Sequence, residues 1–156
     1  MKYCDFLGPQ RIIFPAGSDK NEVIFQLAEL AAKEGVVQSK DDLAEKLFYR
    51  EQLMSTGIGI GLGIPHVRYD GILQPFLAMA VRPAGIAGYE SMDGIPVRIA
   101  IMILLGQGEH KTHVQILSQI TRHFKDSQDS GKSLMDRLCA MDNPQQMYEL
   151  IKKELS

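Results

Sequence analysis

The chain has 156 residues, of which 45% are hydrophobic and 23% charged, and its formal net charge is −2 at pH 7. This length and composition predict one compact domain with a substantial core, and the absence of a basic stripe or tail excludes a typical nucleic-acid-binding protein. Cys4 and Cys139 are too few and too far apart to predict a disulfide framework or a zinc site. Because no apolar run is long enough to cross a bilayer or to form a leader, we expect a soluble, unprocessed chain in the reducing cytoplasm, with no membrane insertion.

The first third of the chain predicts one strand followed by two amphipathic helices. The strand covers residues 12–14. The first helix follows a capping box at Asp19 and ends at Gly35, and the second follows Ser39. Arg50 lies near the end of the second helix, where a cation favours the helix dipole, so its position has an explanation that needs no function.

A glycine-rich run at 57–64 is the most unusual stretch, since glycine alternates there with an aliphatic residue. This period predicts one extended strand with a bare face, which another group is expected to approach closely. Pro65 then fixes the backbone before His66, and an imidazole held in this way suits a nucleophile or phosphoryl acceptor. The alternative is an edge strand whose glycines allow close packing and whose histidine faces water. No GxGxxG or GxxxxGK[ST] motif is present, which argues against a nucleotide cradle.

The rest of the chain continues the alternation of strands and helices, which predicts an α/β fold with helices on both faces of a sheet. The predicted elements are a turn at 67–71, buried strands at 77–81 and 97–105, a polar loop at 106–113 leading into a helix, a loop at 125–132, a short helix around 134–138 and a last helix that begins after Asn143.

Histidines gather where the strand at 97–105 gives way to the polar loop. Loops at the ends of central strands are where α/β sheets usually place their sites, so His113 has a plausible position for function. A metal site formed by His66, His110 and His113 is an alternative, although a catalytic zinc site would also need an open position and a nearby acid or base. Otherwise His110 and His123 are interpreted as solvated residues.

Three motifs together point to a known family. Arg50-Glu51, the segment at 55–59 and Ile64-Pro65-His66 resemble the active-site signature of the enzyme IIA proteins of the fructose/mannitol type, which include the nitrogen-regulatory enzyme IIA proteins. These belong to the bacterial phosphoenolpyruvate-dependent sugar phosphotransferase system. Further similarity at 93–97 and at His113 extends the resemblance over nearly the whole chain. It implies that residues 1–156 form one enzyme IIA type-2 domain, with a mixed sheet flanked by helices on both faces.

The resemblance also implies a chemistry and a set of roles. His66 is expected to accept a phosphoryl group on Nε2 from the phosphohistidine of the carrier protein HPr and to pass it to a cysteine of an enzyme IIB. Arg50 and His113 are the expected catalytic neighbours of His66, and no cofactor or metal is required. Phosphoryl-binding groups are expected at Ser55, Thr56 and Gly57.

Alternatives remain for the branch of the family and for the partner surface. A nitrogen-regulatory protein, whose phosphorylation state controls its binding to a target protein, would share the same histidine, and so would a degenerate module that binds without transferring phosphate. Met54, Ile60 and Leu62 are candidate apolar contacts for a transient partner. Ile60 replaces a residue that is usually small and polar in the family, and Gly63 replaces the usual alanine.

Overall fold

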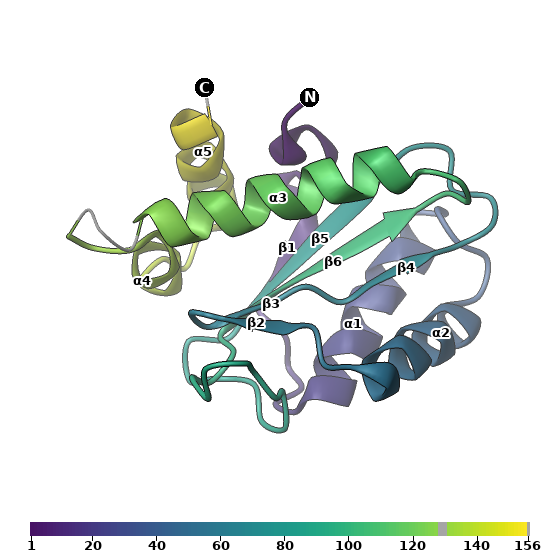
Figure 1. Cartoon of the computed structure of the whole chain (residues 1–156), viewed down its shortest axis with the longest axis horizontal. Coiled ribbons are helices and arrows are strands. Elements are labelled where there is room, and N and C mark those ends of the chain that lie inside the picture. Colours follow the sequence, from purple (N-terminus) through teal and green to yellow (C-terminus); the bar gives the residue numbers. More distant parts are fainter. Residues whose placement is uncertain (128–130, 156) are drawn as a thin grey trace.

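One mixed β-sheet separates two groups of helices in the computed structural model, which describes residues 1–127 and 131–155 (Figure 1). The helices are α1 (Lys20–Lys33), α2 (Lys40–Leu53), α3 (His110–Asp126), α4 (Leu134–Cys139) and α5 (Pro144–Leu155), with the 3-10 helices η1 (Tyr3–Phe6) and η2 (Pro9–Arg11) near the N-terminus. The strands are β1 (Ile12–Ile13), β2 (Gly57–Gly59), β3 (Leu62–Gly63), β4 (His66–Arg68), β5 (Phe76–Val81) and β6 (Ile99–Leu105).

Strand β6 is the centre of the sheet, and all seven of its residues are buried. The strand order is β1-β5-β6-β3-β2, and β4 pairs with β6 beyond the end of β3. β5 runs antiparallel to β6, whereas β3 and β4 run parallel to it. The predicted mixed sheet is therefore confirmed.

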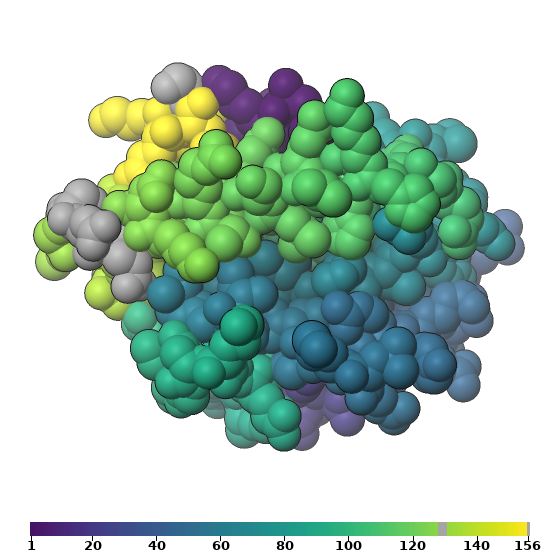
Figure 2. Space-filling view, viewed as in Figure 1, coloured from purple at the N-terminus to yellow at the C-terminus, as the bar shows by residue number. Residues whose placement is uncertain are grey.

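The two faces of β6 pack against different helices. Ile101 and Ile103 belong to a core cluster that also contains residues of α3, α4 and α5, whereas Met102 and Leu104 belong to a second cluster with α1 and α2. In the space-filling view, α3 in green covers the upper part of the face shown. Below it lie the blue segment that contains α2 and the glycine-rich run and, at the lower left, a teal-green segment (Figure 2). Helices thus cover both faces, as predicted.

The predicted helix starts are confirmed by their caps. The carboxylate of Asp19 accepts a hydrogen bond from the Glu22 backbone N–H at 2.9 Å, and the Ser39 hydroxyl accepts one from the Asp42 N–H at 3.1 Å. Asn143 caps α5 in the same way. The loop predicted at 125–132 falls partly on residues 128–130, which lie outside the described residues. No helix in the described part of the chain is both long and apolar enough to span a membrane.

The glycine-rich run is not one strand, so that prediction is wrong. It folds back on itself as the antiparallel pair β2 and β3, because Gly59, Ile60 and Gly61 have positive φ angles of 101°, 56° and 85°. Two of these three are glycines, which adopt such angles without a steric penalty. Alternating glycines are compatible with both a straight strand and a tight turn, so the period could not separate them.

The expected close approach to the bare glycine face is confirmed, and the approaching group is the protein itself. A Cβ atom on Gly57 would overlap the carbonyl oxygen of Glu90. At Gly63 a Cβ atom would lie 2.6 Å from the ring of Tyr89. The glycines therefore let the connection at 88–91 pack directly on the hairpin backbone.

Replacing Gly63 by alanine is expected to destabilise the protein by about 1–3 kcal/mol, because the added methyl group overpacks the buried contact with Tyr89. Urea unfolding of the Gly63→Ala variant measures this cost. In a Tyr89→Leu background the ring atoms are gone, so the same alanine should cost much less and the two changes should be non-additive. Equal costs in both backgrounds would contradict the contact.

Candidate functional site

His66 begins β4, and its side chain is oriented by the backbone two residues earlier. Its Nδ1 lies 2.7 Å from the carbonyl oxygen of Ile64. Because a carbonyl only accepts hydrogen bonds, Nδ1 carries the proton, and Nε2 of the neutral ring keeps a free lone pair. Burial lowers the pKa of His66, the bond to Ile64 opposes this, and the charge of Arg50 adds to the lowering. The lowered pKa favours the neutral ring at pH 7, and the bond to Ile64 leaves its Nε2 lone pair free.

His113 lies beside His66, with ring centroids 4.7 Å apart and an interplanar angle of 56°. The loop predicted to reach His113 is shorter than expected, since α3 already begins at His110. His113 Nε2 is buried and has no hydrogen-bond partner among the described residues. The pKa of His113 is lowered to about 4, chiefly by burial, and the interaction with the neighbouring His66 ring and the positive charges of Arg68 and Arg50 add to this effect. A neutral ring with an unsatisfied nitrogen therefore faces the nucleophile.

Arg50 lies in the last turn of α2 and reaches the site from the other layer of helices. One of its terminal N–H groups donates to the carbonyl oxygen of Met54 at 2.8 Å. Its charge lowers the pKa values of His66 and His113, so the guanidinium acts electrostatically on both rings. The structure thus brings His66 and His113 into ring contact, and Arg50 acts on both rings through its charge.

The three predicted phosphoryl-binding residues make hydrogen bonds and packing contacts within the protein. Thr56 is 5% exposed, its hydroxyl donates to the carboxylate of Glu51, and the Tyr89 hydroxyl lies 2.6 Å away. The Ser55 hydroxyl donates to the carbonyl oxygen of Glu90 at 2.6 Å, and Gly57 packs on the same carbonyl. Their binding of a phosphoryl group stays a prediction, and a hydroxyl would have to exchange its present partner to take part.

A buried ion pair that the sequence analysis did not predict lies behind this segment. Lys20 Nζ is 2.8 Å from Glu51 Oε2, and the two side chains are only 15% and 6% exposed. Glu51 also accepts the backbone N–H of Thr56 at 3.0 Å. Lys20 lies 4.7 Å from the centre of the Tyr89 ring. Lys20, Glu51, Thr56 and Tyr89 form the Glu51 cluster. It holds the segment between α2 and β2 in place, and with it the end of α2 that carries Arg50.

Arg68 is the second residue that the sequence analysis missed. The predicted turn at 67–71 is wrong at its start, because His66–Arg68 form β4 in register with β6. Arg68 Nε is buried, and no hydrogen-bond partner for it is found in the described part of the chain. The spacing of His66 and Arg68, two apart on an extended segment, was the available signal.

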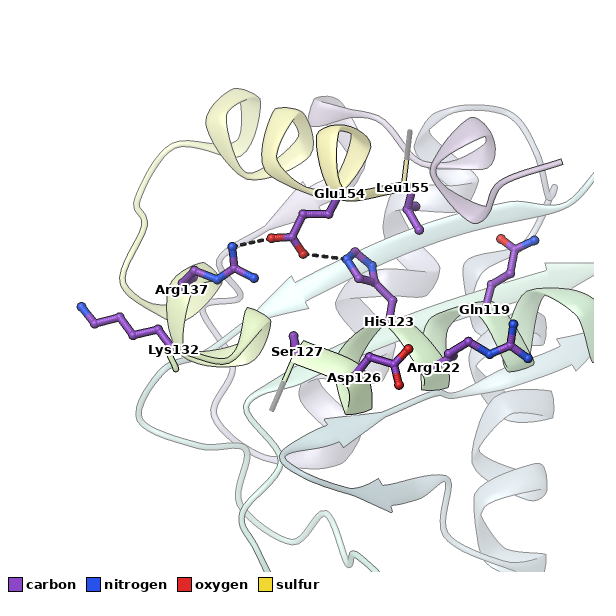
Figure 3. A pocket seen from close by; sticks show the side chains of 9 residues that line it. All are labelled: Gln119, Arg122, His123, Asp126, Ser127, Lys132, Arg137, Glu154 and Leu155. Atoms are coloured by element: carbon purple, nitrogen blue, oxygen red, sulfur yellow. Dashed lines mark hydrogen bonds and ion pairs between the residues drawn. The ribbon is translucent and has the colours of Figure 1, made fainter. Parts of the chain in front are cut away.

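The remaining histidines have different surroundings. His110 is exposed, as predicted. The prediction that His123 is solvated is wrong, since its Nδ1 lies 2.7 Å from the Tyr3 hydroxyl and its Nε2 lies 2.9 Å from Glu154. His123 lines a cavity of about 710 Å³ at the far end of α3, where Arg137 also pairs with Glu154 (Figure 3). None of the predicted site residues lines this cavity. Across residues 1–127 and 131–155, no group of three or more His, Cys, Asp or Glu side chains is placed to hold a metal ion.

Comparison with known proteins decides the family. Residues 5–154 match the family described as "Phosphoenolpyruvate-dependent sugar phosphotransferase system, EIIA 2". The chain belongs to this enzyme IIA family. This is the family that its motifs resemble.

Relatives of this enzyme IIA chain come from both branches of the family. It is 36% identical over 103 residues to a PTS system fructose-specific EIIA component of Haloferax volcanii, and the match covers 66% of each chain. It is 31% identical over 144 residues to a nitrogen regulatory protein of Pseudomonas aeruginosa, covering 92% of this chain and 89% of the relative. The crystal structure of nitrogen regulatory protein IIA-Ntr from Neisseria meningitidis superposes with a TM-score of 0.82 at 26% identity, covering 95% and 97% of the two chains.

Three exposed apolar side chains lie near the C-terminal end of α2 in this enzyme IIA protein, among polar and charged neighbours. Leu53, Met54 and Met92 are 65%, 72% and 87% exposed, and all three line a cavity of about 580 Å³ next to α2. The prediction that Met54 is available to a partner fits this surface. Ile60 is only half-buried, whereas the prediction for Leu62 is wrong because β3 lies between β2 and β6 and buries this side chain completely.

The His113 ring is expected to titrate near pH 4 in the unphosphorylated protein, because burial and the nearby positive charges disfavour its protonated form. The unfolded chain, with a histidine pKa of about 6.5, binds more protons between these two values. The free energy of unfolding should therefore fall as the pH is lowered from about 6.5 towards 4. An NMR titration of the ring and urea unfolding across this range measure both effects, and titration of His113 near pH 6.5 would contradict the prediction.

Proposed function

We propose that residues 1–156 act as one cytoplasmic enzyme IIA unit in which His66 carries a phosphoryl group. The donor is the phosphohistidine of an HPr-type carrier, and the acceptor is a cysteine of an enzyme IIB in a sugar-uptake pathway. One observation carries the proposal. The Ile64 carbonyl holds the proton of His66 on Nδ1, so Nε2 is free to attack next to a second imidazole and a guanidinium.

The transfer forms and breaks equivalent bonds. The donor's N–P bond breaks while a bond forms between phosphorus and Nε2 of His66, and a donor ring protonated on its other nitrogen leaves as neutral imidazole. His66 gains the positive charge that the donor ring loses. This charge is shared over the ring, and the hydrogen bond from Nδ1–H to the Ile64 carbonyl stabilises it. Passing the group to a cysteine thiolate reverses the change on His66.

Arg50 and His113 supply the groups that meet the phosphoryl oxygens. An arginine fork can hold two oxygens at once, and placing a positive charge beside a transferring phosphoryl group is the main way in which proteins promote this reaction. The buried Nε2 of His113 has no partner in the described structure, and in the tautomer that carries its proton on Nε2 the ring would donate a hydrogen bond to an oxygen of the phosphoryl group.

A nitrogen-regulatory role is the second candidate. It is supported by the similarity to the Pseudomonas aeruginosa nitrogen regulatory protein, which extends over more of this chain than the match to the fructose-specific relative. In this role the same phosphohistidine would change the affinity for a regulatory target protein instead of feeding sugar uptake.

Reconstitution tests the proposal and separates the two roles. The chain is incubated with phosphoenolpyruvate, enzyme I and HPr, and its intact mass is measured before and after a purified enzyme IIB is added. We expect one phosphoryl group on the chain, which then moves to the enzyme IIB cysteine. A phosphorylated chain that cannot deliver its phosphate, but binds a kinase or an ion transporter in only one phosphorylation state, would favour the regulatory role. A chain that gains no mass would refute both.

A further inference from the structure

Two buried nitrogens near His66 lack hydrogen-bond partners within residues 1–127 and 131–155. They are Nε of Arg68 and Nε2 of His113. Leaving a buried polar group unsatisfied costs about 1–3 kcal/mol, more for a charged group. Two such atoms in one small region therefore call for an explanation, and an absent ligand that accepts hydrogen bonds from both is a direct one.

The strand register places Arg68 on the same side of the sheet as His66. His66 and Arg68 are opposite Ile103 and Leu105 of β6, and both of these belong to the core cluster on the α3 side. Val67 packs with the cluster on the α1 and α2 side. Successive side chains in a strand point to opposite faces, so His66 and Arg68 both face the layer that contains His113.

The charge of Arg68 also acts on the site. It lowers the pKa values of both His66 and His113, as expected for a guanidinium close to the two rings. The same positive charge would stabilise a phosphoryl dianion held between them.

Arg68 differs from Arg50 in how it is held before phosphate arrives. Arg50 comes from α2 and already donates to the Met54 carbonyl, whereas the buried Nε–H of Arg68 bonds to no group in the described structure. A phosphoryl oxygen on this N–H would therefore displace no existing hydrogen bond. Such a preorganised donor binds with little loss of other interactions.

We propose that Arg68 is a phosphoryl-binding residue, which holds the group on His66 from the α3 side of the sheet while Arg50 holds it from the α2 side. This assignment rests on the proposed function of His66. The buried Nε–H and a neighbouring N–H of the guanidinium form the fork that binds two oxygens, and the anion is a phosphoryl group or a free phosphate of the same shape.

Binding of inorganic phosphate to the unphosphorylated protein tests the assignment without any partner protein. NMR shifts of the His66 and His113 rings report the affinity for phosphate in the wild type and in Arg68→Gln, Arg68→Lys and Arg122→Gln. The last variant is the matched control, because Arg122 is an exposed arginine of α3 outside the site. Amide spectra show whether each variant is folded.

We expect Arg68→Gln to weaken phosphate binding by about 10-fold or more, since hydrogen bonds to charged groups contribute about 1.5–3 kcal/mol. The phosphate affinity of Arg68→Lys should lie between those of the wild type and Arg68→Gln, because lysine keeps the charge without the fork. The affinity of Arg122→Gln should equal that of the wild type. Equal affinity in Arg68→Gln and Arg122→Gln would overturn the assignment, as would a wild type that binds no phosphate. If Arg68→Gln does not fold, Arg68→Lys is compared with the wild type instead. A weaker phosphate affinity in Arg68→Lys supports the assignment, and an equal affinity overturns it.

Phosphorylation by HPr separates this assignment from the proposed function. A wild type that binds phosphate through Arg68 but gains no phosphoryl group from HPr would refute the proposed function alone. The role of Arg68 alone would be refuted by a different result. In that case the wild type is phosphorylated on His66, and the Arg68→Gln variant is phosphorylated at the same rate and binds phosphate with unchanged affinity.

Discussion

Replacing His66 by alanine is expected to abolish phosphoryl uptake from HPr, with the initial rate falling on the order of 10⁴-fold or more, as when other catalytic nucleophiles are removed. The reason is structural. His66 is the ring whose proton is fixed on Nδ1 by the Ile64 carbonyl, so its Nε2 is the free nucleophile. The neighbouring His113 has no such orienting bond within the described residues, and its low pKa reflects burial more than activation. Intact mass after incubation with phosphoenolpyruvate, enzyme I and HPr measures the loss.

His110→Ala is the control for this substitution. His110 is exposed and lies one helical turn before His113, so its loss tests for a general effect of removing a histidine from this region. It should leave the phosphorylation rate within about twofold of the wild type, as expected for a surface substitution away from the reacting atoms. Retention of the phosphate in His66→Ala would place the acceptor elsewhere and remove the basis of the proposed function.

Glu51→Gln is expected to lower the free energy of unfolding by about 3–5 kcal/mol, the usual cost of removing one partner from a buried ion pair. The carboxylate of Glu51 neutralises Lys20 at 2.8 Å and accepts two hydrogen bonds from Thr56. The glutamine amide is nearly the same size, but it leaves the ammonium of Lys20 without a counter-charge, and the Lys20 side chain is only 15% exposed. Urea unfolding, followed by circular dichroism, measures the change.

Glu45→Gln provides the matched control, because Glu45 is an exposed residue of the same helix. Its effect should stay within about 0.5 kcal/mol of zero. In a Lys20→Met background the unpaired charge is absent, so Glu51→Gln should cost clearly less than in the wild type. If Glu51→Gln is as stable as Glu45→Gln, the ion pair does not hold the segment between α2 and β2.

The Glu51 cluster also links stability to the site. Thr56 and Arg50 flank the short segment that Glu51 anchors, and Arg50 donates to the Met54 carbonyl within it. A partly destabilised Glu51→Gln protein should therefore also accept phosphate more slowly than Glu45→Gln, since a small displacement of a positioning group is enough to slow transfer.

Local signals in the sequence were sufficient for much of this protein. The caps at Asp19 and Ser39 located the starts of α1 and α2, because a cap is a contact between residues three apart. The apolar run before the polar loop predicted the central strand β6, which is buried throughout. The motifs around Arg50 and His66 indicated the family, whose description matches residues 5–154.

Tertiary structure alone decided how these elements meet. Whether the glycine-rich run stays straight depends on the positive φ angles at 59–61 and on the packing of Glu90 and Tyr89 against it. The pairing of Lys20 with Glu51 and the burial of the Arg68 Nε atom depend on segments that are distant in the chain. Period and capping describe interactions between near neighbours, whereas a long-range contact exists only once the chain has folded. The sequence by itself therefore determined most of the elements and pointed to His66 as the proposed phosphoryl acceptor, and the fold determined what surrounds them.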